Sequence, residues 1–232
     1  MTDYVVPLPA QPSVAVSGDA RRFPVRRIFC VGRNYAEHAR EMGSDPEREP
    51  PFFFTKPADA VVESGATIPY PPETADLHHE VELVVAIGKG GRDIPAGEAL
   101  SHIFGYGVGI DLTRRDLQNK AKDRGRPWDW GKAFDLSAPM AALHPVAAAG
   151  HPANGRIWLK VNGEIRQQGD ISDMIWPVPD VIATLSRSMT LKPGDLIMTG
   201  TPSGVGALVP GDRIEGGIDG LETIDLAIGP RA

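Results

Sequence analysis

Apolar residues in this chain gather in short runs that end at glycine or proline. The clearest runs are RRIFCVG at 26–32, HHEVELVVAIG at 78–88 and IFGYGVGIDL at 103–112. Runs of this length and punctuation are typical of β-strands. A hairpin is predicted over 157–169, IWLKVNGEIRQQG, because Asn-Gly at its centre is a strong tight-turn signal.

Helical spacing is limited to a few short segments. We expect helices in NYAEHAREMG at 34–43, in RRDLQNKAKDRG at 114–125 and over about 179–188. Thr113 to Asp116 resembles a capping box that opens the second of these helices. The terminal run 191–229 reads as several short strands, so the pattern indicates a β-rich α+β fold with a few short helices.

The predicted organisation is an N-terminal extended arm, residues 1–24, followed by a single domain, residues 25–232. The arm is spotted with proline and only weakly periodic. Within the domain, the polar loop 44–51 interrupts the strand pattern and is expected to be mobile.

Composition and charge narrow the possible classes of protein. Gly 26 and Pro 22 make up 48 of 232 residues, which disfavours long helices and coiled coils. The net charge of -6 argues against nucleic-acid binding. Cys30 is the only cysteine, so an internal disulfide and a multi-cysteine zinc site are excluded. With no long apolar run or leader-like N-terminus, we expect a cytoplasmic protein that does not enter a membrane.

Two glutamates interrupt the most apolar of the predicted strands. Glu80 and Glu82 lie two residues apart, so their carboxylates share one side of the strand. Asp111 follows the next apolar strand and could supply a third carboxylate. Three hard oxygen ligands favour Mg²⁺, Mn²⁺ or Ca²⁺ over zinc or copper. The alternative is a solvated edge strand beside an ordinary helix-start aspartate.

Two helical segments carry further candidate groups. His38 and Glu41 are spaced i, i+3, so the carboxylate could orient the imidazole for proton transfer. Arg115 and Gln118 share one face of the helix after Asp111, near any metal bound there. Ordinary exposed polar pairs are the competing interpretation for both helices.

Two loops complete the set of candidates. Lys132 lies in WDWGKAFD, between aromatic residues, where its ammonium group could be held in a site. The glycine-rich turn TGTPSGVG, 199–206, offers hydroxyls and amides for a carboxylate or oxyanion. It does not match a phosphate-binding loop.

These segments together resemble the fumarylacetoacetate hydrolase family. The resemblance is carried, in the family's order, by VGRNYAEHAREMG, FFTKP, HHEVELVVAIGK, GYGVGIDLTRRDLQ, WGKAFD, LKVNGEIRQ, MIWPVPDVI and GDLIMTGTPSGVG. It runs from about Arg26 to the C-terminus. The chain length and the motif sequences most resemble those of the small acylpyruvate hydrolases, and particularly those of the fumarylpyruvate hydrolases of gentisate degradation.

The resemblance implies a mixed β-barrel or roll, a homodimer and a set of site residues. By matching motif positions, it assigns Glu80, Glu82 and Asp111 to the metal, expected to be Mg²⁺ with Mn²⁺ or Ca²⁺ possible. It assigns His38, Glu41 and Lys132 to catalysis, with the first two on a lid. It assigns the substrate-binding positions to Arg33, Asn34, Arg115, Gln118 and Thr201.

The activity implied is metal-dependent hydrolysis of a carbon–carbon bond in a 2,4-diketo acid such as fumarylpyruvate. The alternatives left open are an oxaloacetate decarboxylase, an isomerase or decarboxylase of the 2-hydroxyhepta-2,4-diene-1,7-dioate type, and a non-enzymatic metal-stabilised binding protein. The expected partner is the small diketo acid alone.

Overall fold

The structure is a computed structural model that describes residues 4–41 and 50–231, with the backbone alone of 39–41. Its largest sheet has eight strands in the order β4-β3-β15-β8-β9-β11-β5, with β12 paired to β9. The strands are β3 (Arg27–Gly32), β4 (Phe52–Lys56), β5 (Val61–Glu63), β8 (Val81–Ile87), β9 (Ile103–Ile110), β11 (Ala138–Met140), β12 (His144–Pro145) and β15 (Asp195–Met198).

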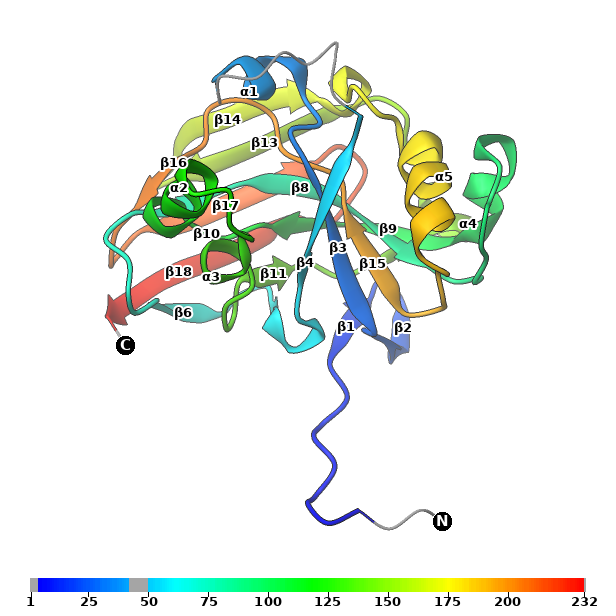
Figure 1. Ribbon diagram of the computed structural model, residues 1–232, viewed down its shortest axis with the longest axis horizontal. Helices are drawn as coiled ribbons and strands as arrows, with labels where there is room; N and C mark the ends of the chain where they lie inside the picture. The colour runs from blue at the N-terminus through cyan, green and yellow to red at the C-terminus, as the bar shows by residue number, and fades with distance from the viewer. Residues whose placement is uncertain (1–3, 42–49, 232) are drawn as a thin grey trace.

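Three smaller sheets complete the strand framework. One has the order β14-β13-β17-β18-β6, another β10-β7-β16, and β1 pairs with β2. Their strands are β1 (Ser13–Val16), β2 (Asp19–Pro24), β6 (Thr67–Tyr70), β7 (Leu77–His79), β10 (Thr113–Arg114), β13 (Arg156–Val161), β14 (Glu164–Asp170), β16 (Gly206–Leu208), β17 (Arg213–Ile218) and β18 (Ile224–Arg231). Figure 1 shows the two large sheets curling around one side of the molecule, as expected of a mixed β-roll.

Strand β8 lies in the middle of the largest sheet and is buried on both faces. Val81, Leu83 and Val85 join the main hydrophobic core, which also takes side chains from the five-stranded sheet. Val84 and Ala86 point the other way, into a second core. Because every position of β8 is enclosed, any charged side chain on it must find a partner inside the protein.

The helices are short and lie around the sheets (Figure 1). They are α1 (Ala36–Glu41), α2 (Arg115–Asp123), α3 (Asp129–Lys132), α4 (Val146–Ala149) and α5 (Val178–Ser188), with 3-10 turns η1 (Ala58–Ala60), η2 (Ala96–His102) and η3 (Ile171–Asp173). Helices α2 and α3 pack against each other, and α5 packs against η2. No helix in the described part of the chain is long and apolar enough to cross a membrane.

The helix α2 forms where it was expected, but the predicted capping box is wrong. The N-cap residue is Arg114, whose side chain makes no capping hydrogen bond. Thr113 Oγ1 donates to the carbonyl of Asp111, and Asp116 accepts from Thr74 Oγ1 at 2.6 Å instead. A tertiary contact to the preceding strand region therefore replaces the local cap.

The N-terminal segment is extended only in part. Residues 13–24 form the antiparallel hairpin β1-β2, in which Gly18 has a φ of 73°. Val14, Val16 and Phe23 of this hairpin are buried in the second core. Residues 4–11, before the hairpin, are exposed and extend away from the body (Figure 1). The predicted hairpin at Asn162-Gly163 is confirmed, with φ values of 53° and 82°.

A buried carboxylate joins β15 to β3, the strand that leads to α1. Asp195 is fully buried, and its oxygens lie 2.9 Å from Arg26 Nη1 and 2.9 Å from Arg27 Nη2. It also accepts a hydrogen bond from the backbone of Lys192 at 2.9 Å. The two strands run parallel here, with Asp195 opposite Arg27.

Replacing Asp195 by alanine is expected to lower the free energy of unfolding by about 2 kcal/mol, because charged hydrogen bonds are lost while water partly re-solvates the arginines. Urea denaturation measures the change. The matched control is Asp19→Ala, which removes an exposed pair with Arg21 and should leave stability little changed. Equal effects of the two substitutions would contradict the structural role assigned to Asp195.

Candidate metal centre and active site

Three carboxylates converge at the point where β8 begins and β9 ends. The two strands are antiparallel neighbours with Val81 opposite Ile110, so Glu80 and Asp111 are brought together, and the Asp111 amide donates to the Glu80 carbonyl at 2.8 Å. Glu82 lies two residues further along β8. One oxygen from each carboxylate lies within 4.8 Å of the others. Glu80, Glu82 and Asp111 are 5%, 2% and 0% exposed, which excludes a solvated edge strand.

Lys132 lies between two of these carboxylates. Its Nζ donates to Glu80 Oε2 at 2.8 Å, to Asp111 Oδ2 at 2.7 Å and to Thr113 Oγ1 at 2.7 Å. These three bonds use all three protons of the ammonium group. Helix α3 therefore brings a fully buried cation onto the acidic cluster.

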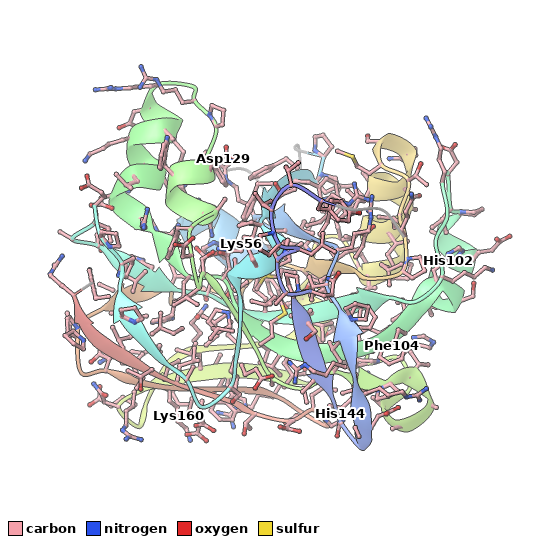
Figure 2. All side chains as sticks on the ribbon, turned by 90° about the horizontal axis from the view of Figure 1, so that it is seen from below. Lys56, His102, Phe104, Asp129, His144 and Lys160 are labelled. Carbon is pink, nitrogen blue, oxygen red and sulfur yellow. The ribbon has the colours of Figure 1, made fainter. Side chains whose placement is uncertain are left out.

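Two further cations complete the neutralisation of the cluster. Lys56 Nζ, from β4, lies 2.8 Å from Asp111 Oδ1 and donates to the carbonyl of Leu112 at 3.1 Å. Arg115, from α2, donates to Glu80 Oε1 and, at 2.6 Å, to Gln118 Oε1. Lys56 lies near the middle of the molecule, whereas Lys160 lies at its outer edge (Figure 2). The three cations thus contact Glu80 and Asp111, and none of these ion pairs involves Glu82.

The carboxylates nevertheless differ in how well they are compensated. Burial opposes ionisation of Glu80, but Lys132 and Arg115 outweigh it and hold its pKa below the usual range. Burial raises the pKa of Glu82 well above its usual value, and the charges of Asp111 and Glu80 raise it further. Negative charge is therefore in local excess at Glu82, although the Gly200 amide donates to its Oε2 at 2.7 Å.

This donor set fits a divalent cation with oxygen ligands. The carboxylate oxygens are close enough to share one ion. Asp111 Oδ1 is buried and accepts no hydrogen bond from the described residues, because its approach to Lys56 is poorly aligned. Excess negative charge at Glu82 would be relieved by a cation. With carboxylates and no thiolate in the cluster, magnesium, manganese or calcium suits it better than zinc.

A pocket opens above the acidic cluster. Its lining includes His38 and Arg33 on one side and the rings of Phe54 and Trp128 on another. His38 is 6% exposed and close enough to Glu80 to favour its ionised form. Helix α1 therefore presents an imidazole to the same space as the cluster. The side chain of Glu41 and the predicted mobile loop, apart from its last two residues, lie outside the described residues.

The helix α2 presents Arg115 and Gln118 to the pocket, as the sequence predicts. Both are buried, and Arg115 also lies 3.4 Å from His78 Nδ1 through its Nε. In this structure the guanidinium is bonded to Glu80. The guanidinium therefore faces the pocket, where it could contact a ligand, while its bond to Glu80 holds it at the acidic cluster.

The glycine-rich turn also lines the pocket, but its polar groups are largely engaged by the protein. Thr201 Oγ1 donates to the Val81 carbonyl at 2.7 Å and accepts from Gln167 Nε2 at 2.8 Å. The Gly200 amide, expected to face a substrate anion, bonds Glu82 instead. The turn therefore fixes β8 and Glu82 in place.

Arg33 and Asn34, adjacent in sequence, have different surroundings in this structure. Arg33 lines the pocket, with its guanidinium 5.5 Å from the centroid of the Phe52 ring. Asn34 is fully buried and lies outside the pocket lining. Its Nδ2 donates to the carbonyls of Thr199 and Trp176, and its Oδ1 accepts from the Trp176 amide. This differs from the expected substrate contact, since Asn34 here holds the start of α1 in position.

The sequence analysis missed several residues of the site. Lys122, Phe54 and Trp128 line the pocket, whereas Lys56 contacts Asp111 and Thr113 accepts a hydrogen bond from Lys132. A lysine ending the apolar run FFFTK is a signal for Lys56, because a charged group rarely ends a buried strand without a partner. Lys122 follows Gln118 by four residues on the same helical face, so the helical period alone could have identified it.

Known proteins resemble the chain over most of its length. A crystal structure of fumarylpyruvate hydrolase from Pseudomonas aeruginosa, with Mn²⁺ and pyruvate, is 52% identical, covers 98% of this chain and 100% of that chain, and has a TM-score of 0.97. A candidate fumarylpyruvate hydrolase from Burkholderia cenocepacia is 62% identical, with coverage of 100% and 97% and a TM-score of 0.94.

A curated relative carries a different activity in its name. The mitochondrial oxaloacetate tautomerase FAHD1 of Rattus norvegicus is 45% identical over 88% of this chain and 91% of its own length. The sequence model of the fumarylacetoacetate (FAA) hydrolase C-terminal family matches residues 27–228. With its sheet framework and acidic cluster described above, this chain belongs to the fumarylacetoacetate hydrolase family.

Proposed function

We propose that this protein hydrolyses the carbon–carbon bond of a 2,4-diketo acid, with fumarylpyruvate as the substrate that fits best. Water adds its hydroxyl to the 4-carbonyl carbon, the bond between C3 and C4 breaks, and a proton reaches C3, giving fumarate and pyruvate. The observation that carries the proposal is the buried acidic cluster under a cationic pocket. The 52% identical Pseudomonas aeruginosa enzyme, crystallised with Mn²⁺ and pyruvate, supports the choice of substrate.

Glu80, Glu82 and Asp111 would hold a divalent cation, Mg²⁺ by preference, with Mn²⁺ or Ca²⁺ as alternatives. When bound, the ion supplies Lewis-acid stabilisation of negative charge that develops on the substrate's oxygens. Lys132 and Arg115 keep Glu80 ionised. A cation at the cluster would offset the excess negative charge at Glu82, so that a bound diketo acid, itself an anion, is less strongly repelled there.

His38 is assigned the removal of a proton from the attacking water. It is buried, lies on a short helix and faces the pocket, so it can hold one water against a bound substrate. Glu41 is proposed to orient its imidazole. Arg33, Gln118 and Thr201 are assigned contacts to the substrate. Asn34 contributes by holding α1 in place.

A second candidate activity is the tautomerisation of oxaloacetate, supported by the name of the relatives at 45% identity. Decarboxylation of oxaloacetate and the isomerase reaction of a 31% identical neighbour, a 2-hydroxyhepta-2,4-diene-1,7-dioate isomerase, belong to the same group. These reactions share stabilisation of an enolate. Only hydrolysis requires an activated water, so the role of His38 separates hydrolysis from decarboxylation. Tautomerisation and isomerisation move a proton and can use the same base, so their products distinguish them.

The proposal extends to the enzyme's location, oligomeric state and partners. We place it in the cytoplasm as a homodimer that takes free diketo acids and has no nucleic-acid or membrane partner. This rests on the family resemblance and on the net charge of -6.

Addition of fumarylpyruvate with Mg²⁺ or Mn²⁺ is expected to cause loss of enol absorbance and formation of fumarate and pyruvate. Chelation of the metal should abolish turnover, and added metal should restore it. Folded, metal-loaded protein that produces no fumarate would contradict the hydrolase assignment. Oxaloacetate is assayed alongside it, because turnover of that acid alone would favour the tautomerase.

Replacing His38 by asparagine is expected to lower kcat for hydrolysis by about a hundredfold or more, since general-base catalysis is lost. Glu41→Gln should act in the same direction. Any oxaloacetate decarboxylation, which needs no attacking water, should fall much less. The control is Glu37→Gln, on the exposed side of the same helix, which should leave both rates unchanged. Loss of every activity together would argue against a water-specific role.

Replacing Glu82 by glutamine is expected to remove the stabilisation that Mn²⁺ gives to the wild-type fold. At a hundredfold excess over Kd, bound metal adds about 2.7 kcal/mol. Without metal the variant should be as stable as the wild type or more so, because a poorly compensated buried charge is gone. Melting temperatures with chelator and with Mn²⁺ test this. Exposed Glu98→Gln is the control, and an unchanged Mn²⁺ shift in Glu82→Gln would contradict it.

A further inference from the structure

One face of α2 runs from the acidic cluster toward the mouth of the pocket. Arg115, Gln118 and Lys122 are spaced by three and four residues and therefore lie along one side of the helix. All three line the pocket. At about 1.5 Å of rise per residue, the Lys122 backbone lies about 10 Å along the axis from Arg115. Arg115 and Gln118 are buried, whereas Lys122 is only partly buried.

The two ends of this face differ in their charge balance. Arg115 is bonded to Glu80, as described above. Lys122 has its Nζ 5.1 Å from the centroid of the Trp128 ring, and no described carboxylate lies within ion-pair distance of it. Burial, together with the positive charges of Arg115 and Arg33, lowers the pKa of Lys122 to about 8. The outer part of the pocket therefore holds a cation that no carboxylate of the described residues neutralises.

We propose that Lys122 binds an anionic group at the far end of the substrate's acyl chain, and so selects dicarboxylic diketo acids over acylpyruvates with a neutral tail. The inference rests on the proposed function, because it takes the pyruvoyl end to lie at the acidic cluster. A chain that begins there and follows α2 passes the rings of Phe54 and Trp128 before it reaches the ammonium group. The flat apolar wall suits an unsaturated acyl segment, and the cation beyond it suits a carboxylate.

The distance between Arg115 and Lys122 also predicts a dependence on substrate length. A short dicarboxylate such as oxaloacetate, bound at the acidic cluster, places both of its carboxylates near the floor. It does not extend the roughly 10 Å of helix that separates Arg115 from Lys122. Replacing Lys122 should therefore weaken binding of a long diketo acid and leave the binding of oxaloacetate nearly unchanged.

The test compares fumarylpyruvate, which has a distal carboxylate, with acetylpyruvate, which has none. Lys122→Met keeps the aliphatic stem over Trp128 and removes the charge. We expect kcat/KM for fumarylpyruvate to fall by about tenfold to a hundredfold, mostly through KM, because one charged hydrogen bond is lost. The value for acetylpyruvate should stay within about twofold, because no bond to Lys122 exists to lose.

Two further variants control for structural effects. Lys122→Arg keeps the charge and should retain most of the preference for fumarylpyruvate. Lys120→Met removes an exposed lysine from the same helix and should change neither substrate. Equal losses for both substrates in Lys122→Met, or no loss for either, would overturn the inference.

Failure of the inference can be told apart from failure of the proposed function. Wild-type turnover of both diketo acids, with no discrimination lost in Lys122→Met, would remove only the role of Lys122. Absence of hydrolysis in the wild type would remove the proposed function. In that case calorimetric titration of the Mn²⁺-loaded protein with each diketo acid gives the ratio of Kd values, and a ratio unchanged by Lys122→Met overturns the inference as well.

Discussion

Three negative charges are enclosed where two central strands meet, and much of the surrounding structure follows from the need to neutralise them. Carboxylates buried to this degree cannot stay ionised without cations at contact distance. The cations come from separate parts of the chain: Lys56 from β4, Arg115 from α2 and Lys132 from α3. Each of these elements is thereby fixed to the same point, and Arg115 and Lys132 also line the pocket.

The division between strands and short helices has a physical basis. Strands β8 and β9 lie inside the largest sheet, with hydrogen-bonded neighbours on both sides, so they hold Glu82 and Asp111 with little freedom. His38 lies instead on a helix of six residues, whose start is held by Asn34 through bonds to backbone groups of other segments. Rigid placement of the acidic cluster and looser placement of the imidazole are combined in one site.

Much of this could be predicted from the sequence because the signals are local. Two-residue alternation places Glu80 and Glu82 together, and an apolar strand ending in Asp111 predicts the third carboxylate. The pairing of β4 with β3, which brings in Lys56, depends on contacts distant in sequence and has no local signal. The capping box failed for a related reason, since Asp116 is taken by Thr74 of another segment. The role of Glu41 stays a prediction.

The family resemblance identified more of the site residues than their spacing alone did. It did not predict which hydrogen bonds those residues make. Arg115, Gln118 and Thr201 do line the pocket, yet the hydroxyl of Thr201 is committed to Val81 and Gln167. Likewise, the N-terminal hairpin was not foreseen, because β2 carries mostly polar side chains and buries only Phe23.

The ammonium group of Lys132 has a consequence for how the metal site is filled. In small zinc domains the ion holds its ligands together, and the fold is lost without it. Here resident lysine and arginine side chains already pair with Glu80 and Asp111, so these two carboxylates do not depend on an ion for their placement. A divalent cation bound at this cluster would then be an exchangeable cofactor, taken up and released by a folded protein, and its identity would follow the supply in the surrounding solution.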